Sequence, residues 1–185
     1  MAYFITGKAE TLQSDIDGRW YTEHNQLFHD DDGLIYLAPR NYLTDGFTIP
    51  LWIAPIGGGK MQWDIRPAVE HDFECQFHQA ILVNLSLYEL RRQGYVRPYR
   101  KQIGNKIEEI VICEDIPIKF LSVVDVKFNE VNARFKRMMK ATTCIKNWRI
   151  NLMRFAVNFN VGWLASGKKK IDIERLYRGI TNDTN

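Results

Sequence analysis

Residues 64–77 read DIRPAVEHDFECQF, and this stretch decides the fold. Asp64 is a good N-cap, and Pro67 falls in the first turn, where its missing N–H costs nothing. The pattern therefore predicts a helix that begins near Asp64 and continues to about residue 82 or beyond. Its predicted buried stripe consists of apolar residues at helical spacing: Val69, Phe73, Phe77, Ala80 and Ile81.

The segment before this helix predicts β-structure. Residues 19–38 are expected to form a β-hairpin, in which Arg19–Thr22 pairs with Leu34–Leu37. The turn is expected at Asp30–Gly33, with Gly33 at positive φ. Its three consecutive Asp residues favour a plain turn over a calcium site, because calcium loops need alternating acids and a distal Glu.

Two more amphipathic helices are predicted at residues 125–140 and 143–164, since apolar residues recur there every three or four positions. In the first, the predicted core positions are Val131, Phe135, Met138 and Met139. The chain is thus expected to be one α+β domain over residues 1–167, with a small antiparallel sheet packed on about three helices. Residues 79–121 are predicted to be an insertion, in which residues 91–121 form a basic arm or small hairpin, and residues 168–185 are predicted to be a basic to polar tail.

Composition narrows the class of protein. Hydrophobic residues make up 45% of the chain, which suffices for a packed core. The three Cys are an odd number and form no CxxC pair, so a disulfide framework is not expected. The sequence also predicts no signal peptide and no membrane span.

Charge is distributed unevenly along the chain. Residues 1–90 carry five basic and thirteen acidic side chains, whereas residues 91–185 carry twenty and nine. A basic half can meet nucleic acid or anionic lipid. A solvated basic helix face is the favoured interpretation, because aromatic residues are not interleaved with these charges as a single-strand binder requires.

Two short segments carry the candidate chemistry. The first is DGFTIP at residues 45–50, and the second is AVEHD at residues 68–72. If they meet, His71 could act as a general base, because imidazole titrates near neutral pH, and Asp45 could orient its other ring nitrogen. Asp72 could position water or a cation, or could have a purely structural role. The catalytic candidates are therefore His71, Asp72 and Asp45.

A metal site is the alternative use of the same helix. His71, Cys75 and His78 are spaced i, i+4 and i+7, so they share one face, and His and Cys suit zinc. That face lies opposite the apolar stripe, so it could simply be exposed, and nothing local supplies a fourth ligand. No cofactor is expected beyond such a divalent cation.

The two segments, in this order, resemble the domain-of-unknown-function 1353 family of tailed bacteriophages and prophages. The matching positions are Asp45, Thr48, Pro50, His71 and Asp72. Phe47, Cys75 and Asn132 depart from the family pattern, which has a small residue, an aromatic residue and an Asp at these positions. The resemblance implies structural or binding roles for Thr48 and Pro50, and an uncharged group at Asn132 where the family has an acid.

The resemblance implies a tailed-phage virion or virion-assembly protein, associated with the tail, neck or baseplate, in which the His-Asp site is structural. Its partners would be other phage structural proteins, and it would be found in the virion or in the host cytoplasm during assembly. The alternative is a small phage hydrolase acting on the host envelope, with His71 as general base. Nucleic-acid binding by the basic half is a third hypothesis, and the sequence does not decide whether the protein is an enzyme.

Overall fold

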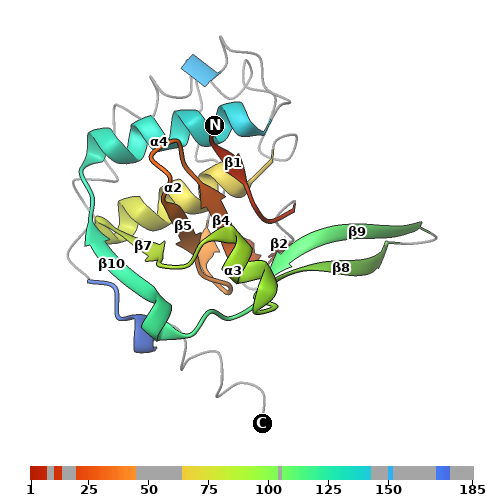
Figure 1. Ribbon diagram of the computed structural model, residues 1–185. Helices are drawn as coiled ribbons and strands as arrows, with labels where there is room; N and C mark the ends of the chain where they lie inside the picture. The colour runs from red at the N-terminus through yellow and green to blue at the C-terminus, as the bar shows by residue number, and fades with distance from the viewer. Residues whose placement is uncertain are drawn as a thin grey trace.

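The computed structural model describes residues 1–7, 11–13, 20–44, 64–103, 106–142, 150–151 and 170–175. Its main feature is a five-stranded antiparallel sheet, which lies beside two longer helices (Figure 1). The α+β class predicted from the sequence is confirmed. In spatial order the strands are β1 (Tyr3–Phe4), β4 (Gln26–His29), β5 (Ile35–Ala38), β7 (Gln79–Val83) and β10 (Leu121–Asp125).

Helices α2 (Arg66–Phe77) and α4 (Phe128–Ala141) run side by side, with α2 against strands β5 and β7 (Figure 1). Helix α4 closely matches the helix predicted at 125–140. One of its faces packs on the core and the other faces solvent, which gives the helical spacing of apolar residues that the prediction used. Each of its four predicted core positions is buried: Val131, Phe135, Met138 and Met139. Its N-cap is Lys127, however, because Asp125 still belongs to β10.

The sheet separates two clusters of buried side chains. On β5, Ile35 and Leu37 belong to one cluster and Tyr36 to the other, as expected from alternation along a strand. Helix α2 contributes to both clusters, through Phe73 and Ala68. It is therefore enclosed on more than one side, and this enclosure determines the surroundings of the candidate site.

The predicted hairpin has the right turn but the wrong first strand. Strand β5 pairs with β4, not with β3 (Trp20–Thr22), which joins β2 (Thr11–Gln13) and β6 (Leu43–Thr44) in a separate sheet. The turn is where the Asp-Gly signal placed it, and Gly33 has φ of 83°. Both runs are rich in β-formers, so local sequence could not decide which of them pairs with β5.

The predicted extension of α2 to residue 82 is wrong. His78 adopts a left-handed backbone with φ of 53° and ends the helix. Gln79–Val83 then form β7, which pairs with β5 and β10. Ala80 and Ile81 continued the helical spacing by coincidence, and in fact they point to opposite faces of the sheet.

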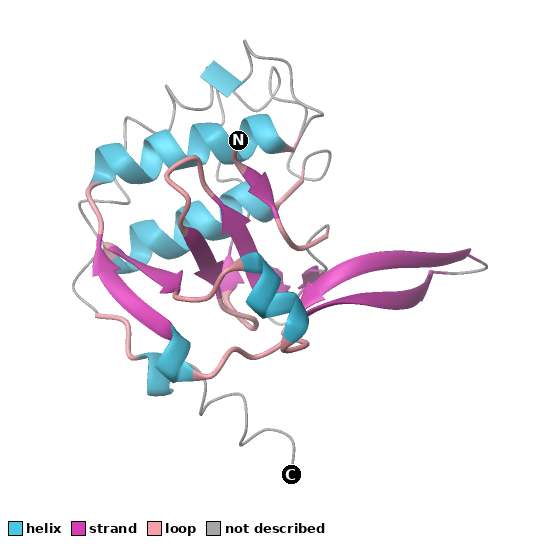
Figure 2. Cartoon of the chain, viewed as in Figure 1, coloured by secondary structure: helices cyan, strands magenta, loops and turns pink. Residues whose placement is uncertain are grey.

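The basic segment contains a projecting hairpin. Strands β8 (Val96–Ile103) and β9 (Lys106–Cys113) form a two-stranded arm that extends from the body, beyond the short helix α3 (Leu87–Arg92) (Figure 2). The segment 79–121, predicted as an insertion, also includes β7 and the 3-10 turn η1 (Ile118–Phe120) and reaches the start of β10. Only the arm projects, since β7 lies inside the main sheet and β10 forms one edge of it.

The structure describes only part of the two segments predicted at the C-terminal end, the helix at 143–164 and the tail at 168–185. Most of the predicted helix at 143–164 lies outside the described residues, but Ile150 is buried in the core cluster that contains Phe135. In the predicted tail, Lys170 pairs with Asp125 at 2.8 Å. The Ile171 N–H donates to Gln79 Oε1 at 2.8 Å. Residues 170–175 therefore contact the body at the β7–β10 edge.

Candidate functional site

His71 lies at the contact between α2 and α4. In the sequence it lies between Val69 and Phe73, two residues of the apolar stripe. Helix α4 packs against α2 and covers the His71 side chain, which is 7% exposed. Its Nε2 is 3.1 Å from Oδ1 of Asn132 on α4. Its ring lies 4.6 Å from the Phe135 ring, centroid to centroid. The alternative that this face of the helix is simply exposed therefore does not hold for His71.

Two neighbours on α2 complete what we call the histidine cluster: His71, Asp72, Cys75, Asn132 and Phe135. The Asp72 carboxylate lies 3.6 Å from His71 Nδ1, and Cys75 Sγ lies 3.5 Å from Nε2. Adjacent helical residues point about 100° apart and do not normally interact. Here the Asp72 carboxylate nevertheless lies within ion-pair distance of the neighbouring His71 ring.

The electrostatics of the cluster favour the imidazolium. Burial lowers the pKa of His71, but the contacts with Asp72 and Cys75 outweigh it and raise the pKa to about 10. At neutral pH both ring nitrogens then carry protons, which point to Asn132 and Asp72. An imidazolium has no lone pair with which to accept a proton, so His71 in this protonation state could not act as the predicted general base.

The other predicted members of the site fall outside the described residues. These are Asp45, Thr48 and Pro50, all in the segment between β6 and α2. The orienting role of Asp45 and the structural roles of Thr48 and Pro50 remain predictions. Asn132, in contrast, is described and contacts His71 directly.

The zinc alternative is not assembled in the described part of the chain. No group of three or more His, Cys, Asp or Glu side chains is placed there to hold a metal ion. His78 is the left-handed C-cap of α2, and the helix ends before it. The i, i+4, i+7 spacing assumed a helix that continued through residue 78.

A second polar group, missed by the sequence analysis, adjoins this site. We call it the buried charge cluster: Asp30, Tyr36, Glu70, Glu74, Arg134 and Arg137. Arg134 on α4 is 5% exposed and forms an ion pair with Glu74 on α2. Its guanidinium also lies 3.6 Å from the Tyr36 ring centroid and 3.5 Å from Asp30. It therefore links α4 to α2, to β5 and to the turn after β4.

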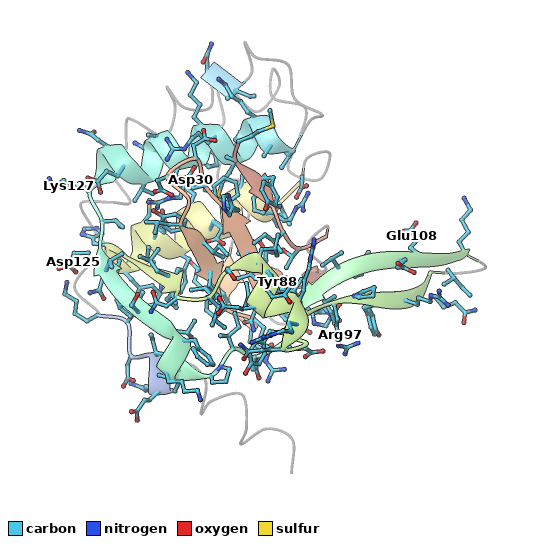
Figure 3. The ribbon with its side chains drawn as sticks, in the orientation of Figure 1. Asp30, Tyr88, Arg97, Glu108, Asp125 and Lys127 are labelled. Carbon is cyan, nitrogen blue, oxygen red and sulfur yellow. The ribbon has the colours of Figure 1, made fainter. Side chains whose placement is uncertain are left out.

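Asp30 anchors the same cluster from the turn. Arg137 donates to both of its carboxylate oxygens at 2.6 Å, the bidentate geometry that arginine favours. Burial alone would raise the pKa of Asp30, but the hydrogen bonds from Arg137 and Asp31 hold it below its ordinary value. Figure 3 shows Asp30 between α4 and the strands. The turn predicted as plain is thus a structural anchor.

The two glutamates of the cluster are disfavoured as anions. Burial and the nearby Glu74 charge raise the pKa of Glu70 well above its ordinary value. Burial raises the pKa of Glu74 to about 7, although Arg134 opposes the shift. Glu70 Oε1 and Glu74 Oε2 are buried and have no hydrogen-bond partner among the described residues. The sequence held one signal for this cluster: Glu70 and Glu74 are two acids spaced i, i+4 within a helix that also has an apolar stripe.

These shifts predict that stability falls as pH rises from about 5 to about 8. Glu70, Glu74 and His71 all have a raised pKa in the folded state, so the folded protein binds more protons than the unfolded chain in this range. Each contribution is complete below the unfolded pKa and is lost as pH rises through the folded pKa. The pKa of Asp30 is lowered, so this residue changes the pH dependence of stability only below this pH range.

Glu70→Gln tests this pH dependence, because glutamine keeps an oxygen that can accept the Ala38 N–H. At about pH 8 we expect the variant to be more stable than the wild type by about 1 kcal/mol. Its free energy of unfolding, measured by urea denaturation, should also depend less on pH between about pH 5 and pH 8. Glu109→Gln, at an exposed carboxylate, is the matched control. Parallel pH profiles for wild type and Glu70→Gln would contradict the assignment.

Comparison with known proteins gave no match among protein-family models, curated proteins or solved structures. Among the described helices, none is both long and apolar enough to cross a membrane.

Proposed function

We propose that this protein is a virion or virion-assembly protein of a tailed phage, in which the His-Asp pair is structural. The observation that carries the proposal is the enclosure of His71: it is 7% exposed, and its two ring nitrogens face Asn132, Cys75 and Asp72. The phage assignment comes from the sequence resemblance, and the structural role comes from this enclosure.

The enclosure favours a scaffold over a hydrolase. A general base must reach the proton that it removes, directly or through one water molecule. His71 is instead held between two helices, and its raised pKa keeps it protonated. A buried imidazolium that bonds to groups on α2 and α4 connects these helices in a defined register, which is a structural task.

Asn132 supports the same proposal. The resemblance implies an Asp at this position, whose negative charge would polarise the histidine or bind a metal ion. An amide oxygen still accepts the Nε2–H hydrogen bond at 3.1 Å but supplies no charge. The substitution retains the helix-to-helix contact and removes the group that the chemistry would need.

His71→Asn separates the two roles. As a structural change it is expected to lower the free energy of unfolding by about 1–3 kcal/mol, because it leaves Asp72 or Asn132 without its partner. We expect particles assembled with the variant to be fewer at high growth temperature and normal at low temperature. The wild type is expected to release nothing from labelled host envelope in the presence of calcium, magnesium or zinc.

Two measurements test the proposal: co-purification of the protein with phage particles, and release of label from host envelope. Wild-type protein should co-purify with intact, washed phage particles, as detected by mass spectrometry, and Asp172→Asn, at an exposed acid, serves as the control variant. Absence of the chain from washed particles would overturn the virion assignment. Envelope release by the wild type that is lost in a folded His71→Asn variant would replace the proposal with the hydrolase.

A further inference from the structure

The outer edge of β9 has backbone groups whose direction the structure defines. In an antiparallel ladder, residues alternate between pointing their N–H and C=O toward the paired strand and away from it. The Val111 carbonyl accepts from Gly7 N–H at 2.7 Å, and Cys113 bridges to Asn25, so both residues face away from β8. By alternation, Ile107 and Glu109 face away as well.

Pro98 on β8 agrees with this assignment. It lies opposite Val111, so it belongs to the outward-facing set of its own strand. Proline lacks an N–H and is tolerated where the N–H would point away from the ladder. The root of the β9 edge is thus covered by Gly7 and Asn25, whereas Ile107 and Glu109 lie further along the arm.

The distal part of this edge is exposed and partly apolar. Ile107 is 73% exposed, and Lys106, Glu108 and Glu109 are exposed beside it. Among the described residues, no strand pairs with the edge beyond Val111. Figure 3 shows Glu108 on the arm, far from the body. Such an edge is a template for another strand unless it is blocked, and the charges along it determine which strand fits.

We propose that β9 pairs antiparallel with β9 of a second copy of this chain, about a two-fold axis at Ile107. This register places Ile107 opposite Ile107 of the second copy, as a pair that exchanges both backbone hydrogen bonds. Lys106 then lies opposite Glu108 of the second copy, and Glu108 opposite Lys106. These flanking pairs are the non-hydrogen-bonded ones, in which side chains are closest, so each copy contributes to two attractive charge pairs.

Charge excludes the neighbouring registers. An axis at Glu108 or Glu109 places like acids opposite each other, and an axis at Lys106 does the same for two lysines. The β8 edge is a poorer choice, because Pro98 donates no hydrogen bond and a two-fold pairing there would bring basic side chains such as Arg100 together. The strand-to-strand contact is small, which predicts a reversible dimer that depends on concentration.

Charge exchange tests the register. Lys106→Glu and Glu108→Lys each create like-charge pairs across the axis, and each is expected to weaken dimerisation about tenfold or more in sedimentation equilibrium. An equimolar mixture of the two single variants is expected to associate again, because both cross-axis pairs become attractive. The mixture leaves each arm internally unchanged, so recovery cannot come from repair within one hairpin.

Ile107→Pro is the second variant, since it removes the outward N–H at the axis without removing a β8–β9 hydrogen bond. It should be monomeric, with a thermal melt like that of the wild type. Lys119→Glu, on η1 away from the arm, is the charge control and should dimerise normally. A wild type that stays monomeric at all concentrations, or a mixture that does not associate, would overturn the proposal.

Discussion

Arg134→Met is expected to lower the free energy of unfolding by about 3–5 kcal/mol, because it removes one partner of a buried ion pair and leaves the others uncompensated. Arg134 is 5% exposed and is the one basic group that contacts both Glu74 and Asp30 in the described part of the buried charge cluster. Without it, Glu74 loses its ion pair, and the Tyr36 ring loses the guanidinium that covers it. Methionine fills similar volume, so the loss measures charge more than packing.

The measurement is urea denaturation at neutral pH, with a control at the surface. Arg97→Met breaks the ion pair between Arg97 and Glu114, whose side chains are 48% and 41% exposed, respectively. The free energy of unfolding should therefore change by no more than about 1 kcal/mol. Adding Glu74→Gln to Arg134→Met should recover part of the lost stability, since it removes the buried carboxylate that the first change leaves without its ion-pair partner. Equal effects of Arg134→Met and Arg97→Met would show that the cluster is accessible to solvent.

Helix α4 was predictable from its sequence, and helix α2 was predictable only in part. Helix α4 has one buried face, so its apolar positions follow the 3.6-residue period that the sequence shows. Helix α2 is covered by the sheet and by α4, and its second face is buried through polar residues such as His71 and Glu74. A buried polar face has the same sequence pattern as an exposed one, which is why the sequence left open whether that face lies in solvent.

The end of α2 and the pairing of the strands depend on tertiary structure. A left-handed cap at His78 is not signalled by a glycine, and the apolar run of β7 continues the helical spacing for two residues. The pairing of β5 with β4 instead of β3 depends on contacts with the core, not on strand propensity. In the arm the two strands pair through a short connection, and β9 has a β-rich sequence, whereas β8 contains Pro98 and three basic residues.

The candidate site shows the same division. His71 and Asn132 were both singled out from the sequence, and the structure places them in contact across α2 and α4. The buried charge cluster was not predicted, because Arg134 and Glu74 are 60 residues apart and Arg137 and Asp30 are 107 apart. No local pattern connects such pairs, and only the fold of α4 against α2 and β4 brings them together.

Phe135→Ala is the second change with a large expected effect, about 3–5 kcal/mol of lost stability. Phe135 is 2% exposed and belongs to the core cluster that α4 forms with the sheet. Truncation leaves a cavity beside the His71 ring, because two packed helices can close only part of the space. Phe135→Leu, which keeps most of the volume, should cost under about 1.5 kcal/mol by comparison.

The same residue tests the enclosure on which the proposed function rests. The rings of Phe135 and His71 lie 4.6 Å apart, so Phe135→Ala and His71→Asn should not be additive in a double-mutant cycle. A coupling of about 0.5–1.5 kcal/mol is expected for an aromatic pair in contact. If the two changes are additive and Phe135→Ala costs under about 1 kcal/mol, then no packed wall covers His71. In that case the imidazole would be open to water and substrate, and the geometric reason for preferring a scaffold over a hydrolase would be lost.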